Sequence, residues 1–189
     1  MPQYGAGVEY ALHTLLNLSL APAGTAPSAR DLADFQKLPL AFMRKLLTQL
    51  EKSGLVIAAE GVRGGWRLSR PPAEISVLDV VDAAHGKDPL FACREIRARC
   101  ALWPDHSPPP AARSGVCAIH AVMLAAESAL RRELAAHTLA DVAAHVEAKS
   151  PQFVGTSVPA WFAERYLGRR AGTGADADAN TPAKRRGRR

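Results

Sequence analysis

The chain has 189 residues, 48% apolar and 6% aromatic, so it allows one domain with extensions and a core built largely from Ala, Leu and Val. No apolar run approaches the ~18 residues of a membrane span, and the first residues lack the basic region and cleavage site of a signal peptide. A cytoplasmic protein with no membrane partner is therefore expected. An odd number of cysteines, three, argues against a disulfide framework.

The net charge of +6 is concentrated in two segments. Residues 28–70 carry eight Lys and Arg against four acidic residues, and residues 168–189 carry seven against two. Such clustering is typical of proteins that bind phosphates. The second segment is rich in Gly, Ala, Asp and Thr and ends in a basic run, which predicts a disordered arm from Gly168 onward. Either non-specific DNA affinity or a solubilising role would suit this arm.

The first part of the chain has the spacing of a helix-turn-helix. Apolar residues at intervals of three and four predict helices over 4–20 and 29–35. Ser28 and Asp31 form an approximate capping box for the second helix, and Pro39 suits the first position of a third. The inward face of this third helix is expected to consist of Leu40, Met43, Leu46, Leu47 and Leu50.

A small hairpin is predicted directly after the third helix, which ends at Gly54. Apolar strands over Leu55–Ala59 and Trp66–Ser69 flank the turn Gly61–Gly65, whose glycines supply the backbone angles that a tight turn needs. A hairpin that follows a basic helix is the arrangement of a winged helix-turn-helix. In that arrangement the helix enters the major groove, and the wing lies along the backbone or minor groove.

Past the hairpin, Ser76 and Asp79 are expected to cap a helix over 77–85 that ends at Gly86. An irregular region follows, then a long helix over about 115–137 and a last one capped by Thr138 and Asp141. An apolar stripe on the long helix predicts a dimer seam or, alternatively, packing on the chain's own core; it comprises Val116, Ile119, Met123, Ala126, Leu130 and Leu134.

These elements predict a mainly α fold, a winged helix-turn-helix with a two-stranded β wing and a long C-terminal dimerisation helix. Four parts are expected: 1–86, the DNA-binding domain; 87–116, a cysteine-containing sensor loop; 117–150, the dimerisation helix and the helix after it; and 151–189, a C-terminal extension with a disordered basic tail. The sequence holds no phosphate-binding loop, hydrolase elbow, zinc-protease motif or dinucleotide fingerprint, so an enzyme is not expected.

Four motifs together resemble the Rrf-two family, the IscR/NsrR type of bacterial winged-helix regulator: Glu9–Leu12, Leu50–Val56, Gly61–Gly65 and Ile75–Val81. The resemblance covers about residues 4–149. It implies a homodimer that binds double-stranded DNA as a repressor or activator. It also implies, for many members, an iron–sulfur cluster whose state decides which promoters are bound.

The chain departs from the family pattern in its DNA-reading residues. Glu60 stands where the family places the wing arginine, and Arg63 lies within the turn. The third helix has Ala41–Arg44 where the family often has Ser-Tyr-Leu-Glu. A carboxylate accepts from cytosine whereas Arg donates to guanine, so a different operator is expected. Arg44 is the predicted base reader and Lys45 a phosphate contact; the full set of candidates is Ser28, Arg30, Leu40, Ala41, Phe42, Arg44, Lys45, Gln49, Arg63 and Gly64.

The cysteines are spaced Cys93-x6-Cys100-x16-Cys117, with a proline-rich insert in the wider gap. Family members commonly bring three cysteines together before the long helix. Cys117 and His120 lie three apart and so share one helix face. A continuous helix over 91–99 would hold Cys93 and Cys100 ~10 Å apart, so both can serve as ligands only if that segment breaks.

The resemblance therefore implies a cluster on Cys93, Cys100 and Cys117, with Glu9 of the partner subunit or His120 as the fourth ligand. The interpretation favours [2Fe–2S] over [4Fe–4S]. Other interpretations remain open: a cluster-free thiol or small-ligand sensor, zinc, no cofactor at all, or a basic DNA-associated module without sensing.

Overall fold

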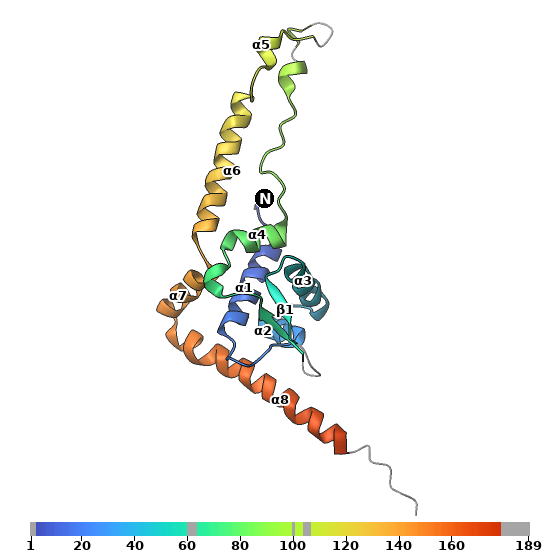
Figure 1. The fold of residues 1–189 in the computed structure, drawn as a ribbon, viewed down its shortest axis with the longest axis vertical. Helices are drawn as coiled ribbons and strands as arrows, with labels where there is room; N and C mark the ends of the chain where they lie inside the picture. Colours follow the sequence, from blue (N-terminus) through green and yellow to red (C-terminus); the bar gives the residue numbers. More distant parts are fainter. Residues whose placement is uncertain (1–2, 60–63, 100, 104–106, 179–189) are drawn as a thin grey trace, which may run out of the picture.

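The computed structural model describes residues 3–59, 64–99, 101–103 and 107–178. The N-terminal part comprises α1 (Ala6–Leu20), α2 (Ala29–Gln36), α3 (Leu40–Lys52), β1 (Val56–Ala58), β2 (Trp66–Leu68), the 3-10 turn η1 (Pro72–Glu74) and α4 (Val77–His85). It is followed by η2 (Ile96–Arg99), α5 (Pro110–Arg113), α6 (Ala118–Ala136), α7 (Leu139–Lys149), the π turn η4 (Phe153–Ser157) and α8 (Val158–Asp178). The fold is mainly helical with a two-stranded antiparallel hairpin, as predicted (Figure 1).

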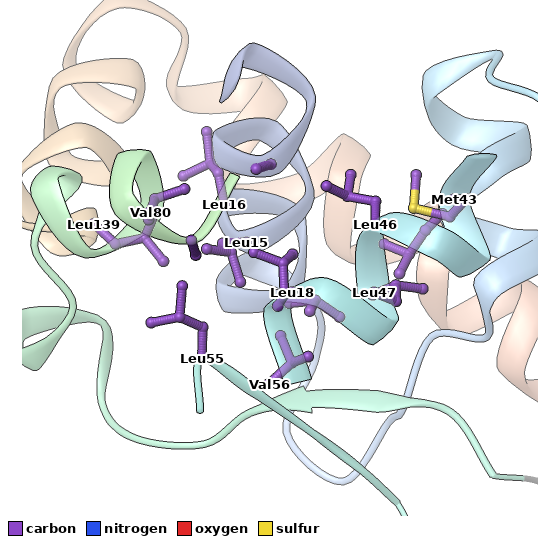
Figure 2. Packing of buried hydrophobic residues seen from close by; sticks show 14 of the residues in the cluster. Leu15, Leu16, Leu18, Met43, Leu46, Leu47, Leu55, Val56, Val80 and Leu139 are labelled. Atoms are coloured by element: carbon purple, nitrogen blue, oxygen red, sulfur yellow. The ribbon is translucent and has the colours of Figure 1, made fainter. Parts of the chain in front are cut away.

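Helix α1 runs through the centre of the core. Its buried side chains include Leu15, Leu16 and Leu18, which pack with residues from α3, the hairpin, α4 and α7 (Figure 2). On α3 the buried residues are Met43, Leu46, Leu47 and Leu50, the predicted inward face except for half-buried Leu40. Burying four such side chains fixes which face of α3 remains outside.

Capping boxes begin α2, α4 and α7, at Ser28, Ser76 and Thr138. In each, the hydroxyl accepts from the backbone N–H three residues on, and the Asp there accepts from the backbone N–H of the capping residue. Burial alone would raise the pKa of Asp79, but hydrogen bonds from Ser76 and the adjacent Arg70 guanidinium lower it overall. The predicted helix starts at all three sites are confirmed.

The hairpin is antiparallel, with Val56 opposite Leu68 and Ala58 opposite Trp66. Its second strand is pinned to the segment before α2, because the Trp66 N–H donates to the Pro27 carbonyl at 2.9 Å. Gly65 allows this approach: a Cβ there would lie 2.1 Å from the Ala26 carbonyl oxygen. Residues 61–63 of the expected turn Gly61–Gly65 lie outside the described residues.

Helix α6 extends away from the rest of the molecule (Figure 1). It is shorter than predicted: α5 is a separate turn, Cys117 is the N-cap residue, and the helix begins at Ala118. Every residue of α6 is described, and none of them is buried. Arg131 attaches α6 to α4 through two hydrogen bonds, of 2.9 and 2.8 Å, to the carboxylate of Asp82.

The prediction that a disordered arm begins at Gly168 is wrong for residues 168–178, which continue α8. Helix α8 forms because Val158 and Phe162 are buried in the core, an anchor that the Gly- and Ala-rich composition after residue 168 did not indicate. Residues 179–189 lie outside the described part. Among the described residues, no helix is both long and apolar enough to cross a membrane.

Replacing Gly65 by Ala should destabilise the protein by about 1–3 kcal/mol, the usual cost of adding a methyl group where there is no room. The new Cβ would collide with backbone rather than with a movable side chain. Thermal or urea unfolding would measure the loss. The control is Gly7→Ala in α1, where nothing lies within 4 Å of the new Cβ; it should leave stability unchanged or raise it. Equal stability of the two variants would contradict the proposed packing of the wing.

Candidate DNA-binding surface and cysteine cavity

The outward face of α3 is basic. Ala41, Arg44 and Lys45 are exposed, on the opposite side from the buried leucines. Within the described residues neither cation has an ion-pair partner. The connection from α2 is tight, because Lys37 adopts a left-handed φ of 54° and the Leu38 N–H donates to the Ala33 carbonyl at 2.9 Å. This geometry presents α3 beside α2 in the manner of a helix-turn-helix.

Other candidates on α3 already make contacts within the protein. The ring of Phe42 packs edge-on against Tyr10, with centroids 5.5 Å apart. The side-chain amide of Gln49 donates to the Ala83 carbonyl of α4 at 2.7 Å. Leu40 is half-buried against the core. For these three, a contact with DNA would compete with an existing contact.

The remaining candidates lie around the start of α2 and the wing. Arg30 is exposed in the first turn of α2. Ser28 is half-buried, and its hydroxyl forms hydrogen bonds with Asp31 as part of the cap. Gly64 is exposed at the start of the returning strand, whereas Arg63 lies outside the described residues.

Two of the cysteines share one cavity. Cys93, from the extended segment after α4, and Cys117, at the N-terminus of α6, line a hollow of about 320 Å³. His120 lies one turn further along α6 and lines the same hollow, as predicted from its spacing. The other walls are largely apolar and are formed by Phe91, Ala92, Ile96 and Ile119, with Arg94 and Glu95.

An ion pair lies at the edge of this cavity. Arg97 donates to both carboxylate oxygens of Glu95, and these bonds lower the pKa of Glu95. The same hydrogen bonds raise the pKa of Arg97, with further contributions from the charges of Glu95, Cys117 and Cys93. The Arg97 guanidinium therefore lies near both thiols.

Residues 91–99 are not one continuous helix; only Ile96–Arg99 form a 3-10 turn, preceded by Glu95 with a φ of 48°. The break that joint ligation by Cys93 and Cys100 requires is therefore present, although Cys100 itself lies outside the described residues. Glu9 is exposed on α1 and does not line the cavity of its own chain. Within the described part, no three His, Cys, Asp or Glu side chains gather closely enough to hold a metal.

The residues that sequence reasoning missed are on α8. Arg165 pairs with Asp34 at 3.2 Å, and Arg169 pairs with Asp31, both on α2. Their spacing of four residues, which continues the spacing from Trp161, was the available signal of one helical face.

Comparison with known proteins places most of the chain in one family. The model of the Rrf2 family, described as iron-dependent transcriptional regulators, matches residues 4–145. The helix-turn-helix regulator Rv1287 of Mycobacterium tuberculosis is 38% identical over 91 residues, which are 48% of this chain and 55% of that protein. The chain thus spans about half the length of this and of other curated relatives that it matches.

Solved structures show the same fold. CymR, the global cysteine regulator of Bacillus subtilis, superposes with a TM-score of 0.57 at 20% identity, over 77% of this chain and 98% of that one. IscR of T. potens also gives a TM-score of 0.57 at 20% identity, over 78% of this chain and 90% of that one. The family match over residues 4–145 shows that the chain belongs to the Rrf2 family of transcriptional regulators.

Proposed function

We propose that this protein is a homodimeric transcriptional regulator that reads double-stranded DNA through α3 and its wing. It would sense redox or nitrosative stress, or iron–sulfur status, through a cluster on Cys93, Cys100 and Cys117. The observation that carries the DNA-binding part is the outward basic face of α3, where Arg44 and Lys45 are exposed opposite a buried leucine face. A helix with one face buried in the core and a basic face outside is suited to enter the major groove.

Replacing Arg44 by Ala should reduce the binding free energy by about 1–3 kcal/mol through the loss of contact with one base pair, and should relax specificity at that position. Replacing Lys45 by Ala, one residue on, should instead weaken all sequences about equally and reduce the salt slope by about 1. Competition binding against a panel of single-base operator variants measures both effects. If both variants lost affinity uniformly, Arg44 would be a phosphate contact and not a base reader.

The support for a dimer comes from α6. The exposed face of this helix, opposite Arg131, carries the apolar and small residues Ala118, Ile119, Val122, Ala125, Ala126 and Ala129. This exposed face differs from the apolar stripe predicted from the sequence, because three residues of that stripe, Met123, Leu130 and Leu134, are half-buried. A projecting helix with an exposed apolar face gains most of its stability from packing against a partner. A second copy of α6 is the proposed partner.

Replacing Val122, which is 68% exposed, by Asp should convert the dimer to a monomer, because it would put a charge into an apolar seam. Light scattering coupled to gel filtration would give the mass. The control is Ser128→Asp, which adds the same charge on another side of α6; this variant should remain a dimer, with twice the mass of one chain. A Val122→Asp protein that remained dimeric would place the interface elsewhere.

The cysteine cavity fits an iron–sulfur cluster in its chemistry. Two thiols and an imidazole lie among largely apolar walls, a set of donors that suits a thiolate-bound centre. Cys100 and Glu9 of the partner subunit, or His120, are proposed to complete the ligand set. When bound, such a group supplies one-electron redox chemistry and reactivity toward small oxidants.

A continuous set of contacts connects the cavity with α3. The Leu90 N–H donates to Glu127 of α6 at 3.3 Å, Arg131 of α6 pairs with Asp82 of α4, and Ala83 of α4 accepts from Gln49 of α3. A change in the segment around Cys93 would therefore act on residues that hold the reading helix. In thermodynamic terms, the two states of the sensor must differ in their preference for the DNA-competent arrangement.

Protein purified without oxygen should be brown with visible charge-transfer absorption, and Cys117→Ser should abolish the colour and the bound iron. His120→Ala and Glu9→Ala identify the fourth ligand, because only the loss of the true ligand should destabilise the cluster or shift its absorption spectrum. Iron and sulfide analysis alongside the spectra completes the measurement. Colourless wild-type protein from iron-replete cells would contradict the cluster and favour a cluster-free thiol or small-ligand sensor.

A further inference from the structure

The C-terminal helix α8 packs on the DNA-binding domain, along the helix that precedes the reading helix (Figure 1). Phe35 of α2 packs against Trp161 and Phe162, with ring centroids 5.0 and 5.1 Å apart. Arg165, one turn further along α8, lies over the Trp161 ring at 4.8 Å and pairs with Asp34. Because Phe162 is buried in the core, this part of α8 has a fixed place on α2.

The next turn of α8 brings Arg169 to the N-terminus of α2. Arg165 pairs with Asp34 and Arg169 with Asp31, so the partners on α2 run backward as α8 proceeds, and the two helices are antiparallel. Asp31 belongs to the capping box of α2, where its carboxylate accepts from the backbone N–H and from the hydroxyl of Ser28, at 2.8 Å each. Arg169 therefore meets α2 at the residues that begin the helix.

The carboxylate that Arg169 contacts is buried. The side chain of Asp31 is 6% exposed, whereas that of Asp34 is 42% exposed. A buried carboxylate needs an opposite charge beside it, because removing one partner of a buried ion pair is strongly unfavourable. The guanidinium of Arg169 supplies that charge from the far end of the chain. The cap that begins α2 therefore depends on the C-terminal extension.

The same guanidinium holds the backbone to which the wing is attached. Arg169 donates to the Ala26 carbonyl at 2.9 Å. Gly65 of the hairpin lies directly against this carbonyl, and the Trp66 N–H donates to the next one, that of Pro27. The short segment before α2 is thus held by α8 and is in turn the support of the returning strand of the wing.

We infer that Arg169 is a positioning residue for DNA binding: it holds the segment before α2 in place and thereby fixes the wing relative to α3. This inference rests on the proposed DNA-binding function. Contacts with the DNA backbone set the register of a protein on a duplex, and a wing that is already in place loses less conformational freedom on binding. Helix α3 has its own anchor, because its leucines lie in the core. Residues 146–189 lie outside the family match, so α8 adds this support to the matched fold.

The test compares two full-length variants that each remove one cation of α8. In Arg169→Gln, the Trp66 amide should exchange its hydrogen roughly tenfold faster or more, the effect of losing one charge-assisted hydrogen bond, while the amides of α3 keep their wild-type rates. Affinity for an operator selected by the wild-type protein should fall by a similar factor, with the base preference read by Arg44 unchanged. The control, Arg165→Gln, removes the exposed pair with Asp34 and should change neither quantity. Equal exchange at Trp66, or equal operator affinity, in the two variants would overturn the inference.

A double variant separates positioning from the removal of a buried charge, and it also serves if Arg169→Gln alone fails to fold. With Asp31→Asn added to Arg169→Gln, no buried carboxylate lacks a partner, so stability against urea should recover. Exchange at Trp66 and operator affinity should remain impaired, because the Ala26 carbonyl still lacks its donor. Full recovery of operator affinity would show that Arg169 only neutralises Asp31, and would overturn the inference. If the wild-type chain selects no operator, the proposed function fails, whereas exchange at Trp66 still decides whether Arg169 holds the wing.

Discussion

The burial of α1 is the constraint on which the rest of the structure depends. Helices α3, α4, α7 and α8 and the hairpin all contribute side chains to the cluster around Leu15 and Leu16. Because these elements share one core, none of them can rotate without disturbing the packing of the others. The basic face of α3 points outward because the leucines on its opposite face are buried in this core.

Polar contacts, in contrast, connect the core with the parts that project from it. Helix α6 is held to α4 by the pair between Arg131 and Asp82, and α8 is held to α2 by pairs at Asp31 and Asp34. The pairs of Arg131 with Asp82 and of Arg165 with Asp34 are partly exposed and contribute little to stability, about 0–1 kcal/mol each, whereas Asp31, the partner of Arg169, is buried. All three pairs fix orientation. They are suited to a protein in which a change in the sensor segment must alter the presentation of a reading helix without unfolding the core.

Much of this architecture could be predicted from local patterns. The Ser-x-x-Asp caps predicted the starts of α2 and α4, a Thr-x-x-Asp cap predicted the start of α7, and the apolar spacing predicted most of the inward face of α3. Sequence alone failed where a long-range contact decides the structure. Residues 168–178 of α8 were expected to belong to a disordered arm because they are rich in Gly, Ala, Asp and Thr, whereas the anchor of the helix, Phe162, lies among residues distant in sequence. Likewise, the presence of Cys93 and Cys117 in one cavity depends on the path of the segment between them.

The central claim is that the state of the cysteine cavity controls DNA affinity. Its most direct test is to titrate anaerobically purified protein on a fluorescent operator duplex with nitric oxide or oxygen, recording visible absorbance and anisotropy together. We predict that operator affinity changes in proportion to the loss of absorbance, and that a scrambled duplex shows no such change. Complete loss of absorbance with operator affinity unchanged would contradict the coupling between the cavity and α3.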